Sequence, residues 1–159
     1  MVLVNPMIPP NTGNVARLCA VTASRLHLVA PLGFSIADKD LRRAGLDYWD
    51  KVHAATWASF EELVAEEKLT AERVHLLTGS QGTTSLWETQ FRAGDWLILG
   101  DEVNGLSKAV LDRFPERRVR VPMIAEPSAR SLNLSTCTGI VVYEALRQIH
   151  SAQRAAQPE

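Results

Sequence analysis

The chain has 159 residues, of which 46% are hydrophobic and 22% charged, and these ordinary proportions for a globular domain exclude a disordered chain. A formal net charge of −1 excludes strong overall basicity, so any RNA contact must come from local basic patches. No apolar run reaches the roughly 20 residues that cross a bilayer. We expect a cytoplasmic protein without membrane contact, with one domain over residues 1–150 and a flexible tail over 151–159.

Short apolar runs that favour β-strands alternate along the chain with stretches that favour helices. The predicted strands are residues 2–4, 26–30, 52–55, 74–78, 96–99 and 119–121. This alternation predicts an α/β fold in which an open, mostly parallel sheet carries helices on both faces.

The predicted helices are residues 13–23, 38–44, 59–68, 107–114 and 133–149. Asn11 or Thr12 can cap the first helix, and Ser59 stands in capping-box spacing with Glu62 at the third. Ser107 can cap the fourth. The last helix is the longest and has a broad apolar face, which favours packing against a partner subunit as well as the sheet.

Ligands of open α/β sheets collect beyond the carboxyl ends of the strands, and three loops there are unusual. In the first, residues 8–17, a diproline precedes a helix start on which Asn14 and Arg17 share one face. One interpretation is that these two side chains contact a ligand. The other is that the segment merely caps the helix and that Arg17 is a surface arginine.

The second loop, residues 97–107, ends an apolar strand with Gly100, Asp101, Glu102 and Gly105. The glycines permit close backbone approach and the carboxylates can hold a hydroxyl-bearing ligand, although a strand-to-helix turn explains the pattern as well. The third loop, residues 121–135, is rich in hydroxyl and amide groups that can contact a purine ring, and its Ser131 or Asn133 can cap the last helix.

Other kinds of site find no support in the sequence. It has no phosphate-binding loop, no dinucleotide fingerprint, no zinc-protease motif and no nucleophile elbow. The four histidines and two cysteines lack ligand spacing, so we expect no metal.

Taken together and in this order, the three loops resemble those of the SPOUT RNA methyltransferases, in particular the short tRNA wobble-nucleotide 2'-O-methyltransferases of the TrmL (YibK) type. The matching segments are residues 8–17, 41–48, 100–107, 130–135 and 143–145, so the likeness spans nearly the whole chain. One departure is Met7, where relatives tend to have a polar or acidic residue.

This resemblance implies a C-terminal trefoil knot, a homodimer, tRNA as substrate and S-adenosyl-L-methionine as cofactor. The cofactor pocket would be lined by Leu77, Thr78, Gly79, Gly100, Glu102, Val121, Met123, Ser131, Leu132 and Leu134. Arg17, Glu102, Ser131 and Asn133 would surround the reacting ribose. The residues expected to contact the RNA are Asn11, Asn14, Arg17, Arg42, Arg43 and Arg130.

Methyl transfer to a hydroxyl needs in-line alignment and a route for the hydroxyl proton. Because a guanidinium holds its proton tightly, Arg17 is interpreted as binding the RNA phosphate and stabilising the developing alkoxide, with a role as base only in a strongly perturbing site. Three functions remain open: a tRNA wobble ribose methyltransferase, a ribose methyltransferase of ribosomal or other RNA, and a non-catalytic RNA-binding dimer.

Overall fold

The structure is a computed structural model that describes residues 1–35, 51–79, 81–124 and 131–156. The predicted helix at residues 38–44 lies outside the described residues, as do Arg42, Arg43 and Arg130. Within the described ranges, no helix is long and apolar enough to cross a membrane.

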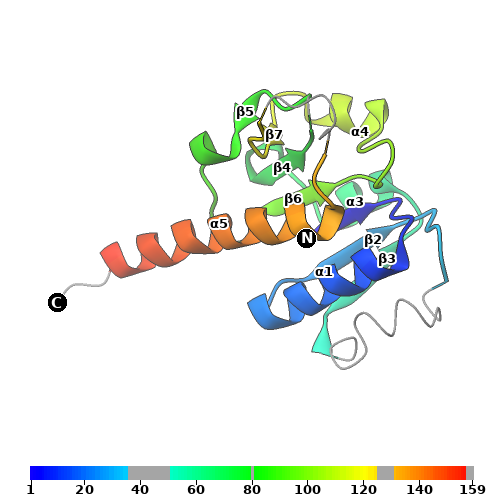
Figure 1. Cartoon of the computed structure of the whole chain (residues 1–159), viewed down its shortest axis with the longest axis horizontal. Helices are drawn as coiled ribbons and strands as arrows, with labels where there is room; N and C mark the ends of the chain where they lie inside the picture. The colour runs from blue at the N-terminus through cyan, green and yellow to red at the C-terminus, as the bar shows by residue number, and fades with distance from the viewer. Residues whose placement is uncertain (36–50, 80, 125–130, 157–159) are drawn as a thin grey trace.

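A parallel sheet forms the centre of the molecule (Figure 1). The described residues form seven strands in the order β3-β2-β1-β6-β4-β7-β5, and every neighbouring pair is parallel. The strands are β1 Val2–Val4, β2 Leu26–Val29, β3 Ala54–Trp57, β4 Val74–Leu77, β5 Thr84–Ser85, β6 Trp96–Leu99 and β7 Arg118–Arg120. The predicted α/β class with a parallel sheet is therefore confirmed.

Helices cover both faces of the sheet, as predicted. They are α1 Pro9–Thr22, α3 Phe60–Glu66, α4 Lys108–Arg113 and α5 Leu134–Ala155, with short 3-10 helices η2 Ala71–Arg73 and η3 Leu86–Glu88. Alternate strand residues point to opposite faces. Leu3 accordingly packs in the core beneath α1 and α5, whereas Val2 and Val4 pack with Phe60 of α3 and Val110 of α4.

The sheet changes its winding direction between β1 and β6. From β1 the chain moves outward through β2 to β3, and it later returns to place β6 on the other side of β1. Such a switch point is where doubly wound sheets leave a crevice beyond the carboxyl ends of their strands. The loops that follow β1 and β6 therefore meet at the natural ligand site of the fold.

Helix α1 begins earlier than predicted. It starts at Pro9 with Ile8 as its N-cap, and no side chain caps it. The prediction that Asn11 or Thr12 caps this helix is wrong, because both lie inside it. Two prolines at its start explain the difference, since a proline has no N–H that would need a cap.

The other predicted caps are confirmed. Ser59 Oγ accepts a hydrogen bond from the Glu62 N–H at 3.1 Å, and Ser107 Oγ accepts one from the Val110 N–H at 3.4 Å. Asn133, rather than Ser131, caps α5. This helix continues past residue 149 to Ala155, into the segment predicted to be a tail, and Figure 1 shows its end projecting beyond the sheet.

The histidines of the core have structural partners. His27 is buried, and its Nδ1 accepts a hydrogen bond from Trp57 Nε1 at 3.0 Å. Burial lowers the pKa of His27 to about 4, so the ring is neutral and suited to that acceptor role. His75 is also buried, and its Nε2 lies 3.0 Å from Asp95 Oδ2. Neither ring lines the pocket described below.

Candidate functional site

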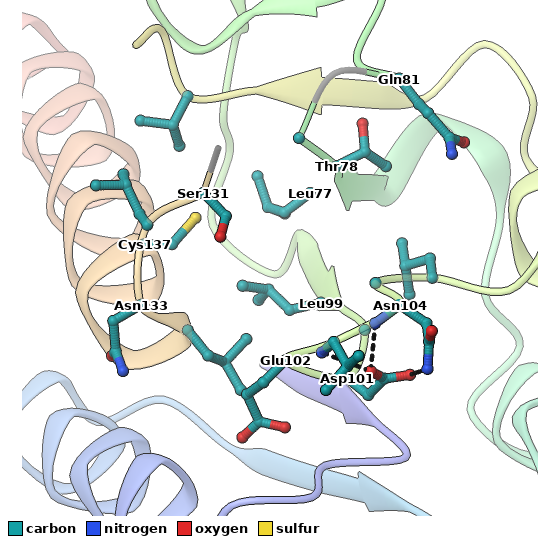
Figure 2. A pocket seen from close by; sticks show the side chains of 18 of the residues that line it. Leu77, Thr78, Gln81, Leu99, Asp101, Glu102, Asn104, Ser131, Asn133 and Cys137 are labelled. Atoms are coloured by element: carbon teal, nitrogen blue, oxygen red, sulfur yellow. Dashed lines mark hydrogen bonds between the residues drawn. The ribbon is translucent and has the colours of Figure 1, made fainter. Parts of the chain in front are cut away.

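A pocket of about 500 Å³ opens beyond the carboxyl ends of β1, β4, β6 and β7. Its volume lies within the range of small-molecule sites. Figure 2 shows Thr78 and Gln81 on one side of the pocket, Asn133 and Cys137 on the opposite side, and Asp101 with Glu102 at its edge.

Every residue predicted to hold the cofactor lines this one pocket. From the loops after β4 and β6 come Leu77, Thr78, Gly79, Gly100 and Glu102. From the segment between β7 and α5 come Val121, Met123, Ser131, Leu132 and Leu134. The structure thus brings together residues that are up to 57 positions apart in the sequence (134 − 77 = 57).

Several lining residues are not among those predicted to hold the cofactor. They are Ile8, Gln81, Leu99, Asn104, Leu106 and Cys137, among others. Cys137 lies one helical turn after Asn133, so helix periodicity could have placed it on the same face. Leu99 and Leu106 flank the glycine turn and lie inside the second loop identified from the sequence, but their apolar side chains gave no sign of ligand contact.

The turn after β6 depends on its two glycines. A Cβ at Gly100 would lie 2.0 Å from the Gly105 carbonyl carbon, which is backbone and cannot move aside. Gly105 itself has a φ of +71°, in the left-handed region that favours glycine. Inside the turn, Asp101 Oδ1 accepts hydrogen bonds from the N–H groups of Val103 and Asn104 at 2.7 and 2.6 Å. The Asp101 carboxylate therefore stabilises its own loop.

Glu102 connects this turn to the start of α1. One carboxylate oxygen accepts from the Met7 N–H at 2.9 Å, and the other accepts from the Ile8 N–H at 3.2 Å and from Asn11 Nδ2 at 3.0 Å. These three contacts occupy the carboxylate on the side facing α1. They favour a positioning role for Glu102 over the role predicted for it at the reacting ribose.

Asn11 extends the same network to α5. Only 6% of Asn11 is exposed, and its Oδ1 accepts from Asn133 Nδ2 at 2.9 Å. Asn133 Oδ1 in turn accepts from the N–H groups of Ser135 and Thr136 at 2.9 and 3.3 Å, which caps α5. Both ends of the Asn11 amide are therefore engaged within the chain. This arrangement argues against the RNA contact predicted for Asn11.

The other residues predicted to act on the ribose and the RNA are divided by the structure. Ser131 and Asn133 line the pocket. Asn14 and Arg17 are exposed on α1 and are not among the residues that line it. The predicted Asn14–Arg17 face therefore lies outside the pocket of its own chain.

The pocket suits a nucleoside-like cofactor. The Thr78 hydroxyl oxygen is buried and has no hydrogen-bond partner among the described residues. At Gly79, next along the chain, no atom lies within 4 Å of the position of a Cβ. Leu77, Leu99 and Leu134 supply apolar walls, the usual surroundings of an aromatic ring. No group of three His, Cys, Asp or Glu side chains in the described ranges could hold a metal ion.

Comparison of the sequence with models of protein families gives the class of protein. Residues 1–143 match the SpoU rRNA Methylase family, and the chain belongs to this family.

Particular relatives agree over nearly the full length. A tRNA (cytidine(34)-2'-O)-methyltransferase of Burkholderia pseudomallei (strain 1106a) is 48% identical over 149 residues, covering 93% of this chain and 94% of the relative. The enzyme of the same name from Polaromonas sp. (strain JS666 / ATCC BAA-500) is also 48% identical, over 93% of this chain and 89% of its own. These relatives confirm the identification made from the three loops.

Solved structures support the same family and fold. A structure that gives insights into the 2-OH methylation of C/U34 on tRNA is 42% identical with a TM-score of 0.86, covering 94% of this chain and 95% of its own. The SpoU methyltransferase AviRb from Streptomyces viridochromogenes, in complex with the cofactor AdoMet, has a TM-score of 0.77 at 22% identity and shares the fold. It covers 99% of this chain and 58% of its own.

The double role of Asn133 leads to a prediction. Asn133→Ala removes both the cap of α5 and the donor to Asn11, and we expect it to lower the free energy of unfolding by about 0.5–2 kcal/mol. Asn133→Asp keeps an acceptor for the α5 amides but cannot donate to Asn11, so it should recover only part of this loss. Urea denaturation of the three proteins measures both effects. Full recovery by the aspartate variant would mean that the Asn11 bond contributes nothing to stability.

Proposed function

We propose that this protein uses S-adenosyl-L-methionine to methylate the ribose 2'-hydroxyl of nucleotide 34 of tRNA, the wobble pyrimidine of the anticodon. The observation that carries the proposal is the convergence of all ten predicted cofactor residues on one pocket at the switch point of the sheet. The choice of tRNA and of position 34 rests on relatives that bear this activity in their names.

In this proposal the chain holds the cofactor with the loops after β4, β6 and β7. Leu77 and Leu134, which line the pocket, would pack against the adenine, main-chain groups near Met123 and Leu132 would contact its edge, and the Thr78 hydroxyl would be available to donate to the cofactor. The cofactor supplies an electrophilic methyl group on a sulfonium. The residues of the pocket then have to hold the ribose hydroxyl in line with it, and good alignment supplies up to about 7–11 kcal/mol of a reaction barrier.

Charged groups near the pocket differ in what they can do. The carboxylates of Asp101 and Glu102 accept hydrogen bonds from their own and neighbouring loops, so we assign them to positioning. Arg17 is the candidate for holding the RNA phosphate and the oxygen that gains negative charge, because a guanidinium offers several donors in a fixed plane. Ser131 lines the pocket and offers a hydroxyl to the ribose.

We also propose that residues 1–150 form a single domain with a trefoil knot in its C-terminal part. The protein is further proposed to be a homodimer. The knot rests on membership of the family. The dimer is supported by the arrangement of α1 and α5, which lie side by side over one face of the sheet (Figure 1). Tyr143 of α5 is 59% exposed there, although aromatic side chains of this size are usually buried in a core or an interface. A partner subunit could also bring its own Arg17 to this pocket.

The proposed function is tested by transferring a labelled methyl group from S-adenosyl-L-methionine to separated tRNA and ribosomal RNA. We expect label in tRNA alone, at the 2'-oxygen of nucleotide 34, located by nuclease mapping. Because the family to which the chain belongs is named for methylation of rRNA, ribosomal RNA is the specific alternative, and label confined to it would contradict the tRNA assignment. Transfer of the methyl group should continue in the presence of a metal chelator, because we expect the reaction to need no metal ion.

Arg17 separates RNA chemistry from cofactor binding. We expect Arg17→Ala to abolish methylation while the affinity for S-adenosyl-L-methionine changes by no more than a few-fold, since Arg17 does not line the pocket of its own chain. Arg17→Lys should recover little activity, because one ammonium group cannot reproduce the planar donor pair. Single-turnover methylation and calorimetry provide the two measurements, and near-normal turnover of the alanine variant would remove Arg17 from the site.

The dimer proposal makes its own prediction. Tyr143→Asp places a charge at the proposed interface, and we expect it to shift the protein toward monomer and to lose RNA methylation. The exposed Trp87 on η3 serves as a control, because Trp87→Ala removes a similar side chain at another surface. Sedimentation at micromolar concentration measures the association state, and a monomeric wild-type protein would refute the dimer.

A further inference from the structure

The loop between β1 and α1 presents two neighbouring apolar side chains to solvent. Met7 is 48% exposed and Ile8 is 42% exposed. Consecutive exposed apolar residues of this size are unusual in a loop that is otherwise well ordered by contacts. Ile8 also lines the pocket, so the pair stands at its border on the side where α1 begins. We call Met7 and Ile8 the apolar ledge.

The backbone of the ledge is held firmly. Both of its N–H groups donate to the Glu102 carboxylate, at 2.9 and 3.2 Å. Two prolines follow it directly, and each restricts its own backbone to a narrow range. The exposure of the two side chains therefore belongs to a rigid loop, which loses little entropy when a ligand binds to it.

Gly33 holds the Met7 side chain from behind. The Gly33 N–H donates to the Pro6 carbonyl at 2.9 Å, which ties the two loops together. A Cβ at position 33 would lie 2.7 Å from Met7 Cα and 3.0 Å from Met7 Cε. The terminal methyl group of Met7 thus packs on the glycine backbone, and one flank of the thioether remains free to contact a ligand.

We propose that the apolar ledge seats the base of the nucleotide that is methylated. The inference rests on the proposed function. In a nucleotide the base is attached to the carbon next to the one that bears the 2'-hydroxyl. A ribose whose 2'-hydroxyl faces the cofactor pocket therefore has its base at the border of that pocket. The ledge borders the pocket beside α1, the helix that carries Asn14 and Arg17, which we assign to the RNA.

The chemistry of the ledge indicates how it recognises the base. A thioether and a branched aliphatic group contact the face of an aromatic ring by dispersion and sulfur–ring interaction, and offer no strong donor or acceptor to its edge. The nearby Glu102 carboxylate is already bonded to three donors of the α1 start. The ledge therefore detects that a base is present without distinguishing cytosine from uracil, whose rings have the same shape but different edges.

The test compares the affinity of the protein, loaded with demethylated cofactor, for three anticodon stem-loops with cytidine, uridine or an abasic ribose at position 34. Wild-type protein should bind the cytidine and uridine forms equally and the abasic form more weakly. Met7→Ala should weaken binding of both base-bearing RNAs by about two- to tenfold, the range of a lost thioether–ring contact, and leave binding of the abasic RNA unchanged. Met7→Leu, which keeps an apolar side chain, should stay within about twofold of wild type.

Trp87→Ala is the matched control, because it removes an exposed apolar side chain that does not line the pocket and should affect all three RNAs equally. An equal loss on base-bearing and abasic RNA by Met7→Ala would overturn the ledge as the base site, even if methylation of nucleotide 34 is established. If wild-type protein methylates ribosomal RNA alone, the proposed function is contradicted, and so is the proposal that the apolar ledge seats the base of nucleotide 34. Cofactor affinity and melting temperature of each variant, unchanged from wild type, show that the differences come from the RNA.

Discussion

The Glu102 carboxylate is the interaction on which the site depends. It accepts hydrogen bonds from two backbone N–H groups of the segment that leads into α1 and from one side-chain amide inside the first turn of that helix. Helix α1 has no acidic residue in its first turn, so a carboxylate from a distant loop supplies the negative charge that favours a helix start. Through Asn11 and Asn133 the same network reaches the cap of α5. The starts of two helices and the turn after β6 are therefore fixed relative to one another at the border of the pocket.

Much of the fold could be predicted from local patterns. The boundaries of β1 and β6 were predicted to the residue because short apolar runs stand between polar or turn-forming residues. Strand β5 was missed, since its Thr84 and Ser85 carry no apolar signal and form a strand only through pairing with β7. Strand β3 begins two residues later than the predicted start at Val52 (54 − 52 = 2), because its position is fixed by pairing with β2 rather than by its own composition.

Local sequence patterns predicted less of the candidate site than of the fold. The ten residues predicted to hold the cofactor were identified through the likeness of three loops to a family, and no rule of spacing would have assembled them. Asn11 illustrates the limit. Because it follows a diproline, Asn11 has the sequence features of a helix cap or a ligand contact. In the structure it is buried and donates a hydrogen bond to Glu102, 91 positions away. Hydrogen bonds over such separations depend on the tertiary fold and leave no mark in a local pattern.

The composition of the pocket wall has a consequence for how the protein matures. The wall takes residues from four segments, beginning at Ile8 and ending at Cys137, near the close of the chain. During synthesis on the ribosome the last of these segments emerges after most of the pocket, so a chain that lacks this segment cannot offer the complete wall. Contacts between distant segments also slow folding, because long loops must close before any contact is gained. Under the proposed function, cofactor binding would therefore require a chain that has completed every part of the wall, and free cofactor would shift the folding equilibrium only for such chains.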